Sequence, residues 1–222
     1  MRSNRICSIL AVIVNGLLVV TAPEKATAQS TYDDIWKLAE WYRNDQNETV
    51  QGVLFSGRFQ HEFAVVDAGQ GAHDEWNVRR MRLGVKSELF SRFTVHVEAG
   101  FNPQERGPFY KRLTDVYVEW ETGDIFTLRV GKQGVPFTMD GSTSSKELLA
   151  VDRSNLANNM WFPEEYIPGV SSSGGRSNWV YQLGVYSGGS GNREFGEFDG
   201  SAFGLLSLGY NFSEVLGVQD AL

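Results

Sequence analysis

Residues 53–65 read Val-Leu-Phe-Ser-Gly-Arg-Phe-Gln-His-Glu-Phe-Ala-Val, a stretch in which apolar and polar side chains alternate. Successive side chains of a β-strand point to opposite faces of the sheet, so this alternation predicts a strand with two unequal faces. Phe55, Phe59 and Phe63 share one face, whereas Arg58 and Glu62 share the other. An apolar outer face with a polar inner face is typical of the wall of a transmembrane β-barrel.

The same pattern recurs and divides the chain into eight expected strands, residues 53–65, 76–89, 93–101, 113–120, 125–135, 169–174, 179–186 and 202–212. Their connections alternate in length. Residues 67–75, 102–112, 138–168 and 187–201 form long ones, whereas 91–92, 121–124 and 175–178 form short ones. Outer-membrane barrels have short periplasmic turns and long external loops, so the chain is predicted to be an all-β, antiparallel barrel. Aromatic residues near the short turns indicate a girdle at one lipid interface: Phe55, Phe93, Trp120, Trp179 and Phe212.

The first 28 residues have the features of a secretory signal peptide. Arg2 and Arg5 precede an apolar run over residues 6–20, and Ala26-Thr27-Ala28 forms a small-residue cleavage site. We therefore expect export to the cell outer membrane. Removing residues 1–28 would change the formal charge from −7 to −9.

Residues 29–52 are expected to form a periplasmic helix and hinge before a barrel over residues 53–222. Tyr32, Ile35, Trp36 and Ala39 recur at helical spacing, and this helix is either a plain lead into the first strand or a plug or partner anchor. Asn44-Asp45-Gln46-Asn47 would end it.

Composition argues against several functions. An acidic exported chain lacks the basic footprint of a nucleic-acid-binding protein. The one cysteine, Cys7, lies in the leader, so the mature chain has no thiol nucleophile and no cysteine metal site. Neither a nucleophile motif nor a metal-ligand pattern is found, so we assign no catalytic residues, metal or cofactor and expect no enzyme.

The expected inner face carries many charges, which a wet lumen tolerates far better than a dry core. Basic side chains predicted to line this face are Arg58, Arg80, Arg82, Lys86 and Arg129, and they are accompanied by carboxylates such as Glu62, Glu98 and Glu119. Rings of basic residues would attract anions through a pore. Alternatively, these residues pair with the carboxylates and merely brace the wall.

The long connection over residues 138–168 calls for a function, because loops of this length are unusual in compact domains. Folded inward, it would constrict the lumen, and Lys146 and Arg153 are the candidate constriction residues. The alternative is an exposed surface loop with a short helix near residues 145–151.

Six blocks, in order over about residues 52–189, resemble the phosphate-selective porin O and P family. They are residues 56–60 (Ser-Gly-Arg-Phe-Gln), 79–86 (Arg-Arg-Met-Arg-Leu-Gly-Val-Lys), 115–119 (Asp-Val-Tyr-Val-Glu), 130–137 (Val-Gly-Lys-Gln-Gly-Val-Pro-Phe), 151–154 (Val-Asp-Arg-Ser) and 184–188 (Gly-Val-Tyr-Ser-Gly).

This resemblance implies a sixteen-stranded outer-membrane porin, commonly a homotrimer. It would contact membrane lipid and pass small anionic or hydrophilic solutes, such as phosphate, along inward arginines and lysines. Arg58, Arg80, Arg82 and Arg129 would belong to the lumen wall. Eight strands are about half of such a barrel, so we expect a partial barrel. The main alternative is a small closed eight-stranded barrel with a structural or adhesive role, and a soluble β-sandwich is a further alternative.

Overall fold

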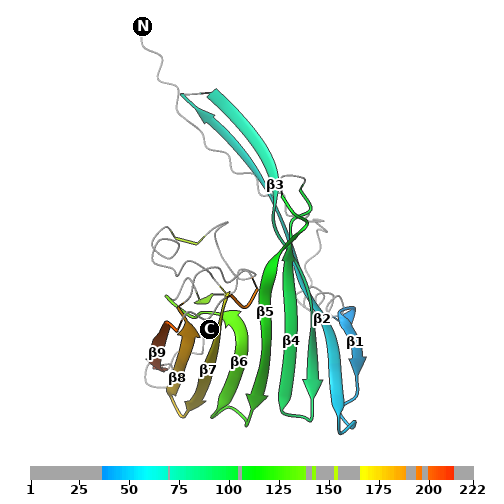
Figure 1. Cartoon of the computed structure of the whole chain (residues 1–222), viewed down its shortest axis with the longest axis vertical. Helices are drawn as coiled ribbons and strands as arrows, with labels where there is room; N and C mark the ends of the chain where they lie inside the picture. The colour runs from blue at the N-terminus through cyan, green and yellow to red at the C-terminus, as the bar shows by residue number, and fades with distance from the viewer. Residues whose placement is uncertain are drawn as a thin grey trace, which may run out of the picture.

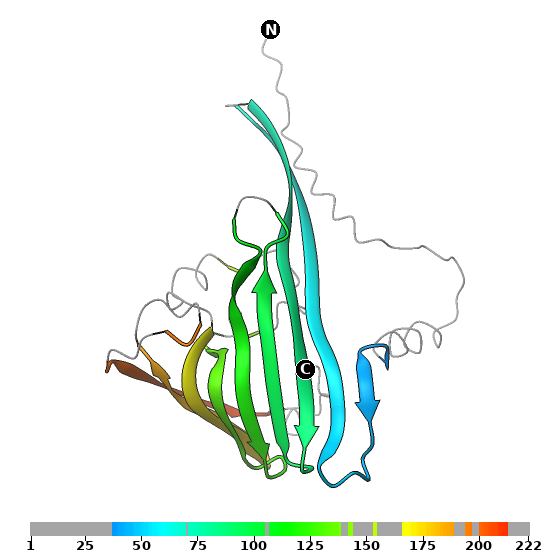
Figure 2. The same ribbon diagram turned by 45° about the vertical axis from the view of Figure 1, so that its right-hand side comes forward.

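The computed structural model describes residues 37–69, 71–104, 107–138, 142–143, 153–154, 166–188, 194–196 and 200–212. These residues form a nine-stranded antiparallel sheet in which each strand pairs with its neighbours in sequence (Figure 1). The strands are β1 (Glu40–Arg43), β2 (Val50–Ala68), β3 (Gly71–Leu89), β4 (Phe93–Phe101), β5 (Tyr110–Glu121), β6 (Thr127–Gly134), β7 (Tyr166–Arg176), β8 (Trp179–Ser187) and β9 (Ala202–Tyr210). The sheet is a curved wall, as Figure 2 shows from a second direction.

The sequence predicted the all-β, antiparallel class correctly, and strands β2 to β9 match the eight expected ones in order. Even the short expected strand at residues 169–174 lies within β7, where it pairs with β6 and β8. Alternation was sufficient here because the two faces of the wall meet different surroundings, which fixes the register of each strand.

The expected amino-terminal helix is wrong where the structure describes it. Residues 40–43 form β1, paired with β2 through Glu40 opposite Leu54 and Arg43 opposite Gly52. Trp41 stacks on Phe55, with ring centroids 5.6 Å apart. These contacts outweigh a helical spacing that depends on only a few side chains. Residues 1–36, which include the predicted signal peptide, lie outside the described residues.

One face of the wall is apolar and exposed. Phe59 is 66% exposed, Leu83 54% and Leu206 77%. Val97, Val118, Val130, Val170 and Val185 continue this face across the intervening strands and are also exposed. An apolar surface that crosses so many strands is far larger than soluble monomers tolerate, and it suits contact with hydrocarbon.

The β2–β3 hairpin rises well beyond the other strands as a two-stranded ribbon (Figures 1 and 2). β3 pairs with β4 only from Met81 to Leu89, whereas β2 and β3 pair as far as Ala68 opposite Gly71. The predicted long loop over residues 67–75 is therefore wrong, since most of it is strand. The polar residues His73, Asp74 and Glu75 resembled a loop in the sequence, although both sides of an isolated ribbon meet water.

Aromatic rings gather at the end of the strands away from the ribbon, beside the short turns. Phe93 lies 6.5 Å from Trp120 and Trp179 lies 5.0 Å from Tyr210, measured between ring centroids. Tyr210 in turn lies 4.7 Å from Phe212. This grouping is the arrangement expected for amphipathic rings at a lipid–water interface. No helix among the described residues is long and apolar enough to cross a bilayer.

A small apolar cluster covers part of the other face. Val135, Ile167 and Tyr186 are its buried members, and Phe137, Phe203 and Leu205 pack against them. Tyr186 follows the exposed Val185 on β8, so its side chain lies on the opposite side of the wall. Phe203 pairs with Tyr186 and lies on that same side. The segment that follows β6 therefore folds over the inner side of β7 to β9.

Candidate functional site

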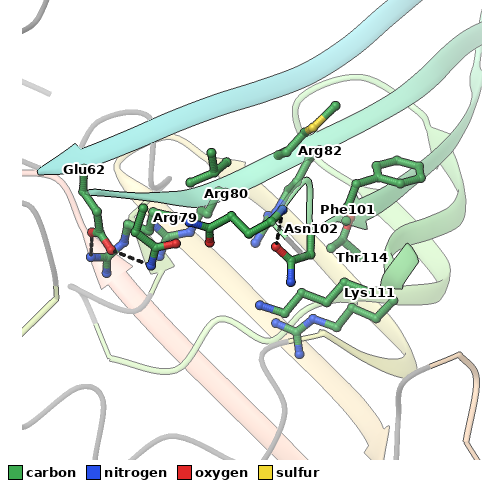
Figure 3. A pocket seen from close by; sticks show the side chains of 14 residues that line it. Glu62, Arg79, Arg80, Arg82, Phe101, Asn102, Lys111 and Thr114 are labelled. Atoms are coloured by element: carbon green, nitrogen blue, oxygen red, sulfur yellow. Dashed lines mark hydrogen bonds and ion pairs between the residues drawn. The ribbon is translucent and has the colours of Figure 1, made fainter. Parts of the chain in front are cut away.

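A cavity of about 470 Å³ lies on the polar face at the base of the ribbon (Figure 3). Its lining comes mainly from β3, β4 and β5. Five cationic side chains line it, Arg79, Arg80, Arg82, Lys111 and Arg112, against one carboxylate, that of Glu62. Because these cations share a concave wall, the potential inside the cavity is positive and favours an anion.

A β-bulge brings one of these cations to the polar face. The register of β2 and β3 shifts between Gln60, which faces Arg80, and His61, which faces Val78, so Arg79 is the extra residue. Its Nη1 donates to Oε2 of Glu62 at 3.0 Å, while Nη1 of Arg80 donates to Oε1 of Gln60 at 3.0 Å. Both guanidinium groups consequently reach the same face. Alternation alone assigned Arg79 to the apolar face, so sequence reasoning missed it.

Arg82 and Arg112 meet at the aromatic ring of Tyr166. The guanidinium carbon of Arg82 lies 4.9 Å from the ring centroid and that of Arg112 lies 5.8 Å from it. Arg82 also donates a hydrogen bond to the Tyr166 hydroxyl, and its Nη1 lies 3.9 Å from Oε1 of Glu98. These contacts hold the two cations in fixed positions, which lowers the entropic cost of binding an anion between them.

The structure places the remaining predicted wall residues on the same face but at different heights. Arg58 lies opposite Arg82 in the β2–β3 register, beside the cationic cavity. Lys86 lies opposite His96, closer to the short turns. Arg129 is closer still, where its Nε donates to Oε2 of Glu119 at 2.7 Å and its guanidinium carbon lies 4.3 Å from the Tyr117 centroid.

Of the two predicted constriction residues, only Arg153 is described. Its Nη2 donates to the carbonyl of Thr143 at 2.7 Å. Thr143 lines a second cavity of about 660 Å³ together with Gln182 and Tyr186 of β8. Thr138, Ser142 and Thr143 therefore lie over β8 and β9 and do not line the cationic cavity, whereas residues 166–168 of the expected loop belong to β7. Lys146 lies outside the described residues.

A second loop also reaches the polar face. Lys132 is fully buried, and its Nζ donates to the backbone carbonyl of Glu194 in the β8–β9 connection. The Tyr110 hydroxyl donates to the carboxylate of the same residue at 2.6 Å. The alternating pattern was not sufficient to find Lys132, because Gly131 has a φ of 134° and interrupts the regular strand geometry.

An antiparallel wall with an exposed aliphatic face, a charged opposite face and loops folded over it has the features of a porin wall. The family model of the phosphate-selective porin O and P matches residues 53–203, and the chain belongs to this family. No curated protein matches the chain significantly. Membership of a porin family implies a channel rather than an enzyme.

Proposed function

We propose that the chain forms the wall of an outer-membrane channel through which small anionic solutes such as phosphate diffuse passively. The observation that carries this proposal is the cavity whose lining has five cationic side chains and one carboxylate. A cation-lined lumen raises the local anion concentration, and guanidinium groups replace part of the hydration shell of the anion.

The proposal includes contact of the apolar face with membrane lipid and enclosure of the polar face as a lumen. Enclosure requires further strand pairing beyond β1 and β9, the first and last strands of the described sheet. Export through residues 1–28 and assembly as a homotrimer are also proposed, and both depend on the sequence and on the family. Arg58, Arg80, Arg82, Lys86 and Arg129 are the proposed lining residues, with Lys146 and Arg153 as the proposed constriction.

The experiment is reconstitution of the full chain in a planar bilayer, with reversal potentials measured in a KCl gradient. We expect a preference for chloride over potassium. The double variant Arg80→Gln, Lys111→Gln removes two lining cations. It should shift the reversal potential towards the value of a cation-selective pore. The matched control is Arg176→Gln, since Arg176 lies exposed beside a short turn, away from the cavity.

Heat-modifiable gel migration verifies that each variant has folded before it is measured. An unchanged reversal potential in the folded double variant contradicts an anion path along this wall. A folded protein that never conducts favours the small closed barrel instead.

A further inference from the structure

The charges on the polar face are unevenly distributed along the strands. On β3, Arg79, Arg80 and Arg82 lie towards the ribbon, whereas Glu88 lies at the short-turn end. On β5, Lys111 and Arg112 lie towards the long connections, whereas Glu119 and Glu121 lie at the short-turn end. The same order therefore appears on two strands that run in opposite directions, so it is a property of the wall and not of one segment.

The neighbouring strands carry further charges on this face. Arg58 of β2 lies beside Arg82 in the cationic part. Glu98 of β4 belongs to the cationic part, because its Oε1 lies 3.9 Å from Nη1 of Arg82 and accepts a hydrogen bond from Thr114 Oγ1 at 3.1 Å. Towards the short turns, the described carboxylates on this face are Glu88, Asp115, Glu119 and Glu121, and the described cations on the same strands are Lys86 and Arg129.

A third cavity at the short-turn end has a balanced lining. Asp45, Glu88 and Glu121 face Arg43, Lys86 and Arg92 across about 450 Å³. Arg43 Nη1 lies 2.6 Å from Oε2 of Glu88, so the pair contributes little net charge. With Asp115, Glu119 and Arg129 added, this end has five carboxylates against four cations among the described residues, in contrast to the cationic cavity.

The two zones are far enough apart to act separately in salt solution. Arg82 and Glu88 are six positions apart on β3, which corresponds to roughly 20 Å at about 3.3 Å per residue. The Debye length at 0.1 M salt is about 10 Å, so each zone sets its own local ion population.

We infer that this wall is electrically bipolar and that the channel rectifies ionic current, with Glu88, Asp115, Glu119 and Glu121 forming the negative pole. This inference rests on the proposed channel function. When the short-turn side is positive, anions from the cationic zone and cations from the carboxylate zone both move towards the boundary between them, and the conductance rises. When the sign is reversed, both move away from the boundary, which is depleted of carriers.

The test is a current–voltage curve for the full chain in a planar bilayer, in symmetric 0.1 M KCl. Orientation is set by a Gly69→Cys, Cys7→Ser variant, biotinylated at the ribbon tip, with streptavidin added to one side. Gly69 has nothing within 4 Å of an added Cβ, so the label fits there. We expect roughly 1.5- to 3-fold more current when the short-turn side is positive, and a symmetric curve at 1 M KCl, where the Debye length is about 3 Å.

Two variants remove opposite poles. Glu88→Gln with Glu121→Gln should reduce the rectification and increase the anion selectivity. Lys111→Gln with Arg112→Gln should also reduce the rectification but decrease the anion selectivity. Asp124→Asn is the matched control, because Asp124 is exposed in a short turn and lines neither cavity.

The outcomes separate the two proposals. A conducting channel with a symmetric curve at 0.1 M KCl overturns the bipolar inference alone, and so does rectification that persists unchanged in both folded double variants. A folded protein that shows no conductance overturns the proposed channel function and the inference with it. Asymmetry that disappears in 1 M KCl and falls in both variants supports the inference.

Discussion

Nη1 of Arg79 lies 3.0 Å from Oε2 of Glu62, across the ribbon formed by β2 and β3. The register of the two strands shifts by one residue at this point, because of the β-bulge between the Gln60 pair and the His61 pair. The bulge places two consecutive arginines on one face of the wall. A regular strand would have sent one of them into lipid, at a cost of about 2–4 kcal/mol if it lay near the bilayer midplane.

The bulge makes a direct prediction for Arg79. Arg79→Gln should reduce the anion preference in reversal-potential measurements about as much as Arg80→Gln, because both guanidinium groups line the same cavity. Glu62→Gln should increase the preference, since it removes the one carboxylate in that lining. If Arg79→Gln leaves the selectivity unchanged while Arg80→Gln lowers it, Arg79 does not face the lumen.

The hydrogen bond from Tyr110 to Glu194 predicts a role in channel size. Tyr110→Phe should release part of the β8–β9 connection from the polar face and increase single-channel conductance. Tyr181→Phe removes a comparable bond, from the Tyr181 hydroxyl to the Ile125 carbonyl at 3.0 Å, but its side chain lies on the opposite face beside a short turn. Equal conductance in the two variants would show that Glu194 does not narrow the path.

Gly131 is predicted to be intolerant of a side chain. Its φ is 134°, and an added Cβ would lie 2.7 Å from Cα of Tyr117 and even closer to the carbonyl oxygen of Val116. Gly131→Ala should lower the free energy of unfolding by about 1–3 kcal/mol, the cost of holding a residue with a side chain at this φ.

The matched control for Gly131 is Gly204→Ala. The nearest atom to an added Cβ at Gly204 is 3.8 Å away, which is an ordinary contact. Urea unfolding in detergent micelles, followed by gel migration, measures both variants. A midpoint for Gly131→Ala equal to that of Gly204→Ala would refute the strained geometry at position 131.

Two tryptophans at different positions along the strands are predicted to have different surroundings. Trp179 lies among the aromatic rings at the short-turn edge, whereas Trp76 lies on the ribbon, 65% exposed, with its ring 5.1 Å from that of His61. In variants that retain a single tryptophan, lipids brominated near the headgroup should quench Trp179 strongly and Trp76 weakly. Strong quenching of Trp76 would place the ribbon within the membrane.

The sequence was sufficient to predict β2 to β9, because a wall between lipid and water imposes a period of two on every strand that crosses it. It was insufficient where that period breaks. Arg79 is the extra residue of a bulge and Lys132 follows a glycine of positive φ, and neither feature has a distinctive composition. β1 was misread because the apolar residues up to Ala39 fit a helical spacing, whereas the strand contacts of Trp41 and Tyr42 come from residues further along the chain, Phe55 and Val53.

The candidate site was likewise predictable only where its residues lie on regular strands. Arg58, Arg80, Arg82 and Lys86 are on the polar face because they share the parity of a regular strand. Lys111 and Arg112 were not selected, because they lie in a segment that was expected to be a loop and instead begins β5. The position of Arg153 over β8 depends on how a long connection folds, and this cannot be obtained from periodicity.

The apolar cluster of Val135, Ile167 and Tyr186 has a geometric consequence for traffic through such a pore. It covers the polar face over β7 to β9 with hydrocarbon, while the guanidinium groups lie on the same face over β3 and β5. A hydrated ion avoids the first region, where it would lose water without compensation. In the proposed channel, the path left for a hydrated solute would lie on the side of the guanidinium groups, so a solute's narrowest dimension, more than its mass, would set its rate of passage.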